Sequence, residues 1–150
     1  MWVGEVNSQQ MSQQVSDWYS LTHIEHGVLF YFLGWLLLPR MSVIQRFLLA
    51  LSVEAAWEML ENAPWFVELY RKQALAIGYT GDSILNSLAD MGFMALGYLV
   101  AATAPVWGSV ALILAIEFFL VLSIRDALAL NILNFLHPVE SISRWQSGAR

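Results

Sequence analysis

Long apolar segments separated by short polar or proline-containing breaks run through most of this 150-residue chain. The breaks contain Pro39, Pro64 and Pro105, and proline does not continue a helix. Each apolar segment is close to the ~20 residues that an α-helix needs to cross ~30 Å of hydrocarbon. The pattern predicts four membrane-spanning helices over about residues 22–38, 43–62, 82–103 and 106–128. We therefore expect an all-α fold, an integral membrane four-helix bundle with short interfacial helices.

Three further segments are too polar or too short to cross a membrane. Residues 1–17 have no periodic apolar face and are expected to form an exposed polar arm. Residues 65–80 include several charged side chains, which predicts a short surface helix followed by a turn. Residues 138–147 begin with proline and place apolar side chains at helical spacing, which predicts a short helix in the membrane interface. The chain, residues 1–150, is expected to be a single membrane domain.

The composition agrees with a membrane protein and narrows the function. Hydrophobic residues make up 58% of the chain, charged residues only 13%, and the mean hydropathy is +0.57. A net charge of -5 without any run of Lys and Arg argues against a nucleic-acid partner. The sequence contains no cysteine, which excludes disulfides, thiolate metal ligands and cysteine nucleophiles.

The polar residues of the predicted spans converge on one side of the membrane. Antiparallel spans joined by short connections place the starts of the first and third helices beside the ends of the second and fourth. The second helix has acidic residues at i, i+4 and i+7, and the third has polar residues at i, i+4 and i+8, so each set forms one stripe. The converging residues are His23 and His26 in the first span, Glu54, Glu58 and Glu61 in the second, and Asp82, Asn86 and Asp90 in the third.

This polar cluster is a candidate functional site because ionisable side chains in hydrocarbon are expensive, about 2.5–3.5 kcal/mol each at a helix centre. Imidazole and carboxylate ligands together suit Zn, Mn or Fe. Helical bundles hold metals with such ligands on facing helices. The candidate metal ligands are His23, His26, Glu54, Glu58, Glu61, Asp82 and Asp90.

Two other interpretations of the cluster remain open. Close carboxylates could carry out acid-base chemistry or proton transfer without a metal, and Glu58 and Asp90 are then the candidate catalytic residues. Alternatively, the cluster is a hydrogen-bonded network that determines helix packing, with Arg125 as counter-ion of the acids. The residues expected to complete that network are Asn62, Asn86, Glu117, Arg125 and Asp126.

Four segments carry a resemblance to a known family. They are Ser16 to Gly27 (SDWYSLTHIEHG), Glu54 to Pro64 (EAAWEMLENAP), Tyr79 to Asp90 (YTGDSILNSLAD) and Ile124 to Leu133 (IRDALALNIL). They resemble a family of small multi-pass inner-membrane proteins of alphaproteobacteria that form a domain of unknown function. More distantly, the order of His, Glu and Asp/Asn at the span ends is similar to VanZ-like membrane proteins. The resemblance implies location in the cell inner membrane and specifies no reaction.

Two signals disagree about the side of the membrane on which the polar cluster lies. Counting Lys and Arg in the connections favours a cytoplasmic cluster. The resemblance implies a further hydrophobic segment and a Cys-containing stretch upstream of Met1, and such an anchor places the cluster on the periplasmic side, which we expect. The expected function is a metal-dependent or carboxylate-based enzyme acting on a lipid-linked or headgroup substrate. The alternative is a non-catalytic subunit or assembly factor of a membrane complex, with the lipid bilayer, other membrane subunits or a second copy of the chain as partners.

Overall fold

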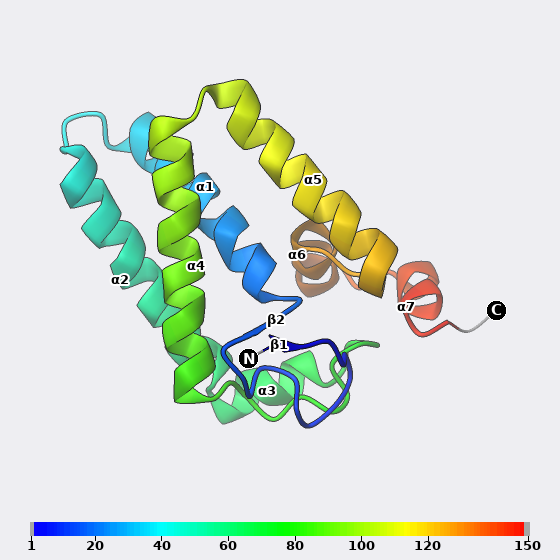
Figure 1. Ribbon diagram of the computed structural model, residues 1–150. Helices are drawn as coiled ribbons and strands as arrows, with labels where there is room; N and C mark the ends of the chain where they lie inside the picture. The colour runs from blue at the N-terminus through cyan, green and yellow to red at the C-terminus, as the bar shows by residue number, and fades with distance from the viewer. Residues whose placement is uncertain (1, 149–150) are drawn as a thin grey trace.

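The computed structural model describes residues 2–148, which form seven helices and one pair of two-residue strands (Figure 1). The all-α class is therefore confirmed. The elements are β1 (Trp2–Val3), β2 (Ser16–Asp17), α1 (Ser20–Leu37), α2 (Val43–Glu61), α3 (Pro64–Tyr70), α4 (Ile84–Thr103), α5 (Val106–Ile124), α6 (Leu128–Leu136) and α7 (Glu140–Gln146). The strands β1 and β2 pair in parallel.

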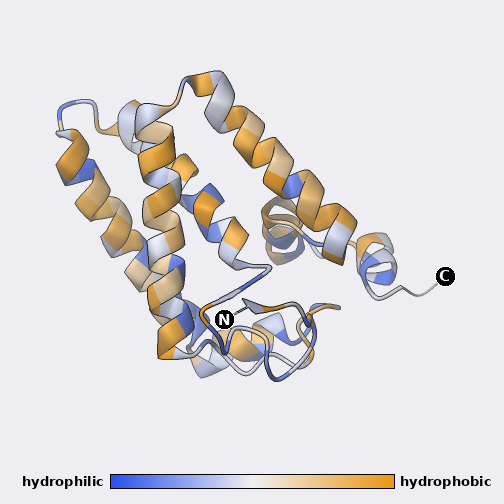
Figure 2. Cartoon of the chain, viewed as in Figure 1, coloured by the Kyte–Doolittle hydropathy of each residue, from blue (hydrophilic) through white to orange (hydrophobic). Residues whose placement is uncertain are grey.

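Within residues 2–148, α4 and α5 are the two helices that are both long enough and apolar enough to cross a membrane. Figure 2 shows α5 coloured hydrophobic along almost all of its length. The helices α1 and α2 have 18 and 19 residues, but the ionisable residues near the site lower their apolar character. Membrane crossing is thus weakly supported for two of the four expected spans by length and composition.

The closest helix pairing is between α1 and α4, and two glycines make it possible. A Cβ atom on Gly27 of α1 would lie 1.9 Å from the carbonyl oxygen of Met94, and one on Gly97 of α4 would lie 2.0 Å from that of Ile24. Small residues at a helix crossing let two backbones approach closely. This contact places the first turns of α1 beside the first turns of α4, where the polar residues lie.

The N-terminal segment is not the exposed arm that its polar sequence predicts. Met11 is 4% exposed and packs with Val67, Ala76 and Tyr79. The backbone oxygen of Ser12 accepts a hydrogen bond from the Ser83 amide at 2.9 Å, which connects the segment to the start of α4. Residues 2–17 therefore cover one end of the bundle, because their backbone and a few apolar side chains find partners there.

Several helix boundaries differ from the predicted spans. The third predicted span starts at residue 82, but α4 begins at Ile84 because the Ser83 side chain accepts a hydrogen bond from the Asn86 amide and caps the helix. The fourth extends to residue 128 in the prediction, but α5 ends at Ile124 because Arg125 adopts a left-handed conformation with φ 58°. The predicted interfacial helix over 138–147 is the shorter α7.

Candidate functional site

A histidine pair of α1 meets a buried glutamate of α2 at the centre of the candidate site. The Nδ1 atom of His23 lies 2.6 Å from Oε1 of Glu54, and Nδ1 of His26 lies 3.2 Å from the same oxygen. Glu54 is fully buried, and the two imidazole rings lie one helical turn apart with centroids separated by 5.0 Å. The predicted stripe of α2 thus faces α1 as the helical period requires.

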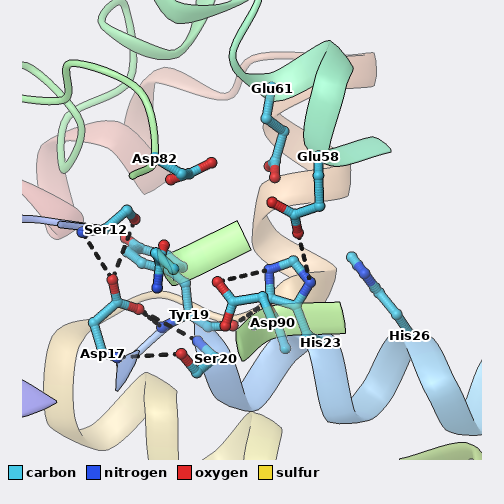
Figure 3. A network of polar contacts seen from close by, with 12 residues as sticks. Ser12, Asp17, Tyr19, Ser20, His23, His26, Glu58, Glu61, Asp82 and Asp90 are labelled. Atoms are coloured by element: carbon cyan, nitrogen blue, oxygen red, sulfur yellow. Dashed lines mark hydrogen bonds and ion pairs between the residues drawn. The ribbon is translucent and has the colours of Figure 1, made fainter. Parts of the chain in front are cut away.

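Two further carboxylates approach His23 from neighbouring helices (Figure 3). Oε1 of Glu58 lies 3.5 Å from Nδ1 of His23, and Oδ2 of Asp90 lies 3.8 Å from its Nε2. The other oxygen of Asp90, Oδ1, is buried and has no hydrogen-bond partner among residues 2–148. The same holds for the amide group of Asn86, one turn before Asp90. The site therefore contains buried polar atoms without partners, and of these two residues only Asp90 lines the cavity described below.

The residues at the centre fit a divalent metal ion. Ligand atoms of His23, His26 and Glu54 lie within 4.8 Å of one another, and so do those of His23, Glu58 and Glu61. Two imidazoles and one carboxylate form a common catalytic zinc site, in which a fourth position stays open for water or substrate. Asp82, which the sequence also places among the ligands, belongs to neither group.

Asp82 instead connects α2 to the loop before α4. Its backbone amide donates a 2.7 Å hydrogen bond to Oδ1 of Asn62, and Nδ2 of Asn62 donates to the carbonyl oxygen of Glu58 at 2.9 Å. Burial raises the pKa of Asp82 to about 6, although hydrogen bonds from Tyr79, Ser12 and Asn62 oppose the shift. Asn62 therefore joins the end of α2 to the residue that precedes the N-cap of α4.

Three tyrosines beside the metal-ligand group were not identified from the sequence. Each donates its hydroxyl hydrogen to a carboxylate: Tyr19 to Asp126 at 3.0 Å, Tyr70 to Glu61 at 2.8 Å, and Tyr79 to Asp82 at 3.0 Å. Burial raises the pKa of all three tyrosines well above 10, and the adjacent carboxylates raise it further. The phenols therefore stay protonated and act as donors.

A cavity of about 410 Å³ joins the histidines to the tyrosine–carboxylate pairs. Its polar lining includes His23, His26, Asp90 and all three tyrosine–carboxylate pairs. The rest of its wall is apolar and comes mainly from α1, α2 and α6, with Leu33, Val53 and Phe135 as examples. The site can therefore accept a molecule that has both a polar and an apolar part.

The polar network differs from the predicted one at the end of α5. Arg125 is exposed and donates a hydrogen bond to the carbonyl oxygen of Trp145 at 3.0 Å; within residues 2–148 it forms no ion pair, so its predicted role as counter-ion is wrong. Asp126 points the other way and accepts hydrogen bonds from Asn131 and Gln146 as well as from Tyr19. The left-handed turn at Arg125 separates the two neighbours.

Glu117 lies away from the cavity, on the other side of α1. It neighbours the fully buried Glu25 of α1 and accepts a 3.0 Å hydrogen bond from the Ala129 amide at the start of α6. This contact connects α5 to α6 across the break between them. Glu117 therefore connects two helices and is not part of the cavity wall.

Comparison with known proteins shows a family match over nearly the whole chain, with relatives that are longer than it. Residues 1–148 match a family model described as "Protein of unknown function (DUF2585)". A UPF0314 protein of Rhizobium etli is 49% identical over 99% of this chain and 76% of its own length. UPF0314 proteins of Paracoccus denitrificans and Sphingopyxis alaskensis are 44% and 46% identical, over 98% and 99% of this chain and 76% and 79% of their own lengths. No solved structure matches the chain.

Proposed function

Because the chain belongs to the DUF2585 family, whose function is unknown, we propose a function from the chemistry of the site: it binds one divalent transition-metal ion through His23, His26 and Glu54. The observation that carries this proposal is the approach of the three ligand atoms to within 4.8 Å of one another, with both histidines lining the cavity and Glu54 buried behind them. The ligand set suits Zn, Mn or Fe.

The proposed activity is metal-dependent chemistry on a lipid-linked or headgroup substrate. A bound metal of this type supplies Lewis acidity and activates water. Glu58 and Asp90 lie 3.5 and 3.8 Å from His23 and are the candidate acid-base residues beside the metal. A lipid substrate is supported by the cavity, because its polar lining continues into an apolar wall.

We propose that α1, α2, α4 and α5 cross the cell inner membrane as one domain, with the site near the periplasmic face. Exposed apolar side chains along all four helices, such as Leu36, Leu48, Leu99 and Leu122, support this placement, because such side chains suit contact with lipid. Most of the ionisable side chains, including those of Glu54, Glu58 and Asp90, are buried away from it. The short helices α3 and α7 would lie in the interface.

The orientation can be tested by cysteine labelling, because the native sequence has no cysteine. Ser42 is the N-cap of α2, and Thr80 lies in the loop before α4, whose Asp82 contacts Asn62 at the other end of α2. Both positions are exposed, so Ser42→Cys and Thr80→Cys each place a thiol on one of the two sides. A membrane-impermeant maleimide added to intact spheroplasts should label Thr80→Cys and leave Ser42→Cys unlabelled until the cells are lysed. Labelling of both positions in intact spheroplasts would contradict the proposed crossing, and labelling of Ser42→Cys alone would reverse the orientation.

The metal proposal is tested by adding Zn²⁺ or Mn²⁺ to chelator-treated, purified protein and measuring thermal stability. A ligand present at 100 times its Kd stabilises the folded state by about 2.7 kcal/mol, so the melting temperature should rise by several degrees. His26→Ala should abolish the rise. His137→Ala, which changes an exposed histidine outside the cavity, is the matched control and should retain it. Equal responses of the two variants would contradict the site.

A non-catalytic role as subunit or assembly factor is the second candidate, and a specific contact favours it. The 2.6 Å hydrogen bond between His23 and Glu54 satisfies both groups without any ion. Glu54→Gln separates the two functions, because an amide oxygen still accepts that hydrogen bond but is a poor metal ligand. If the network is structural, the variant should resemble the wild-type protein whether or not metal is added. If the site binds metal, the response to Zn²⁺ should be lost.

A further inference from the structure

We propose that the cavity binds an amphiphile whose headgroup carries a quaternary ammonium ion, held by the tyrosine–carboxylate pairs beside the metal ligands. This inference deepens the proposed function, since it names the substrate class of the same site and rests on that function for any reaction. Binding of the headgroup does not require the metal. The two proposals can therefore fail separately.

Aromatic rings form a large part of the cavity wall next to the carboxylates. The ring of Tyr70 lies 5.4 Å from that of Tyr79, at an angle of 66°, and 4.9 Å from that of Phe135, at an angle of 83°. All three residues line the cavity, as do Tyr19 and Trp57. Because neighbouring rings stand edge to face, their faces point in different directions along the cavity wall. Such an arrangement attracts a quaternary ammonium group through cation–π interactions.

The charge of the cavity also favours a cation. Its lining includes the carboxyl groups of Glu61, Asp82, Asp90 and Asp126, and among the described lining residues there is no lysine or arginine. The Oδ1 atom of Asp90, a side chain only 4% exposed, has no hydrogen-bond partner within residues 2–148. A negatively charged headgroup would find no lysine or arginine to pair with among these lining residues, whereas a cation meets carboxyl oxygens and ring faces together.

A quaternary ammonium fits this wall better than a primary one. The carboxylates of Glu61, Asp82 and Asp126 already accept hydrogen bonds from tyrosine hydroxyls. Each of these hydroxyls donates its hydrogen to a carboxylate. A primary ammonium ion needs up to three acceptors to replace its hydration, and the unpartnered Oδ1 of Asp90 supplies one of them. A quaternary ion donates no hydrogen bonds and is weakly hydrated. A quaternary ammonium ion therefore needs only ring faces and nearby carboxyl groups.

The apolar wall indicates that the headgroup is attached to a chain. Leu29 and Leu33 are one turn apart on α1 and are 38% and 48% exposed, and Val53 of α2 and Ile132 of α6 are 46% and 48% exposed. All four line the cavity and remain open at its edge. An alkyl chain that leaves the polar region would cover these side chains and bury their apolar surface. A free small cation would leave them uncovered.

The test compares amphiphiles of different headgroup on chelator-treated protein in maltoside micelles. Dodecyltrimethylammonium should raise the melting temperature in a saturable manner, at concentrations at least tenfold lower than dodecylammonium and at least 100-fold lower than choline. Dodecyl sulfate should give no such rise. Equal or better stabilisation by dodecylammonium would overturn the quaternary headgroup, and equal potency of choline would overturn the amphiphile. This ranking uses the wild-type protein and does not depend on any variant folding.

Two variants identify the binding site. Asp82→Asn removes one charge and should weaken the response to dodecyltrimethylammonium at least tenfold, whereas Glu140→Gln removes an exposed charge outside the cavity and should leave it unchanged. Equal responses of these two variants would show binding to the micelle alone and overturn the proposal. The His23→Ala/His26→Ala double variant should still respond to dodecyltrimethylammonium while losing metal. Metal binding without an ammonium response would refute this inference and leave the proposed function intact, and the reverse result would refute the metal site only.

Discussion

Replacing Gly97 by alanine tests whether the close contact of α1 and α4 holds the site together. The added Cβ would lie 2.0 Å from the carbonyl oxygen of Ile24, and ordinary contact begins near 3.4 Å, so the helices would have to separate by about 1.4 Å. The contacting atom belongs to the backbone, so no change of rotamer can relieve the overlap. Overpacking of this kind costs about 1–3 kcal/mol, and a backbone contact belongs near the upper end.

The matched control is Gly92→Ala in the same helix, because a Cβ on Gly92 meets no atom within 4 Å. Alanine is favoured over glycine in a helix by about 1 kcal/mol, so this variant should be slightly more stable than the wild-type protein. Gly97→Ala gains the same helix propensity, so its net loss should be about 2 kcal/mol. Reversible unfolding in mixed micelles with increasing SDS measures both changes.

The separation of the helices should also reach the site. His23 of α1 and Asp90 of α4 are 3.8 Å apart, and a shift of more than 1 Å would move them out of contact. Asp90 faces the ring nitrogen of His23 that does not contact Glu54, and a carboxylate in that place supports metal binding by the imidazole, so Gly97→Ala should bind Zn²⁺ more weakly than Gly92→Ala at a temperature where both are folded. A Gly97→Ala protein as stable as Gly92→Ala, with the same affinity for Zn²⁺, would refute the argument that this contact positions the site.

Three further predictions concern residues outside the helices proposed to cross the membrane. Burial raises the pKa of Asp126 to about 6, above its ordinary 3.8. The folded state therefore favours the protonated carboxyl group, which contributes about 3 kcal/mol to the unfolding free energy below pH 4. This contribution should be lost as the pH rises through 6. Asp126→Asn should remove this pH dependence. If the unfolding free energy changes by the same amount between pH 4 and pH 7.5 in the wild-type and Asp126→Asn proteins, the prediction is contradicted. Asn62→Ala should cost about 1 kcal/mol because the Asp82 amide loses its acceptor, and a change in unfolding free energy below about 0.3 kcal/mol would count against that contact. Arg125→Gly should be neutral or stabilise by up to about 1 kcal/mol, since glycine favours the left-handed conformation; a loss above 2 kcal/mol would instead restore the counter-ion interpretation.

The helical period made the centre of the site predictable. Glu54 and Glu58 are four residues apart, so any helix over this segment presents both on one face, and the histidine pair of the preceding helix lies at the matching depth because the connection is short. The sequence therefore predicts that these glutamates face one or the other histidine, and the structure has His23 at 2.6 Å from Glu54 and 3.5 Å from Glu58. The family resemblance inferred from the same segments is confirmed by the match of residues 1–148.

Other parts of the site depend on contacts that no local pattern reveals. Tyr19 and Asp126 are 107 residues apart in the sequence, and their hydrogen bond follows from the packing of α1 against the α5–α6 connection. The end of α5 also could not be predicted from the sequence. Apolar residues resume after Arg125 and Asp126 and continue to Leu128, and no glycine or proline marks the turn. A nearby local signal did exist for Tyr79, three residues before Asp82, although tyrosine at that spacing is common in loops.

The metal content of the protein tests the central claim most directly. Protein purified without chelator and washed free of loosely bound ions should contain about one Zn, Mn or Fe per chain by elemental analysis. The His23→Ala/His26→Ala variant should contain less than a tenth of that amount, and His137→Ala should contain the same amount as the wild-type protein. Absence of stoichiometric metal from the wild-type protein, together with unchanged stability when Zn²⁺ or Mn²⁺ is added, would contradict the metal site and favour the hydrogen-bonded network.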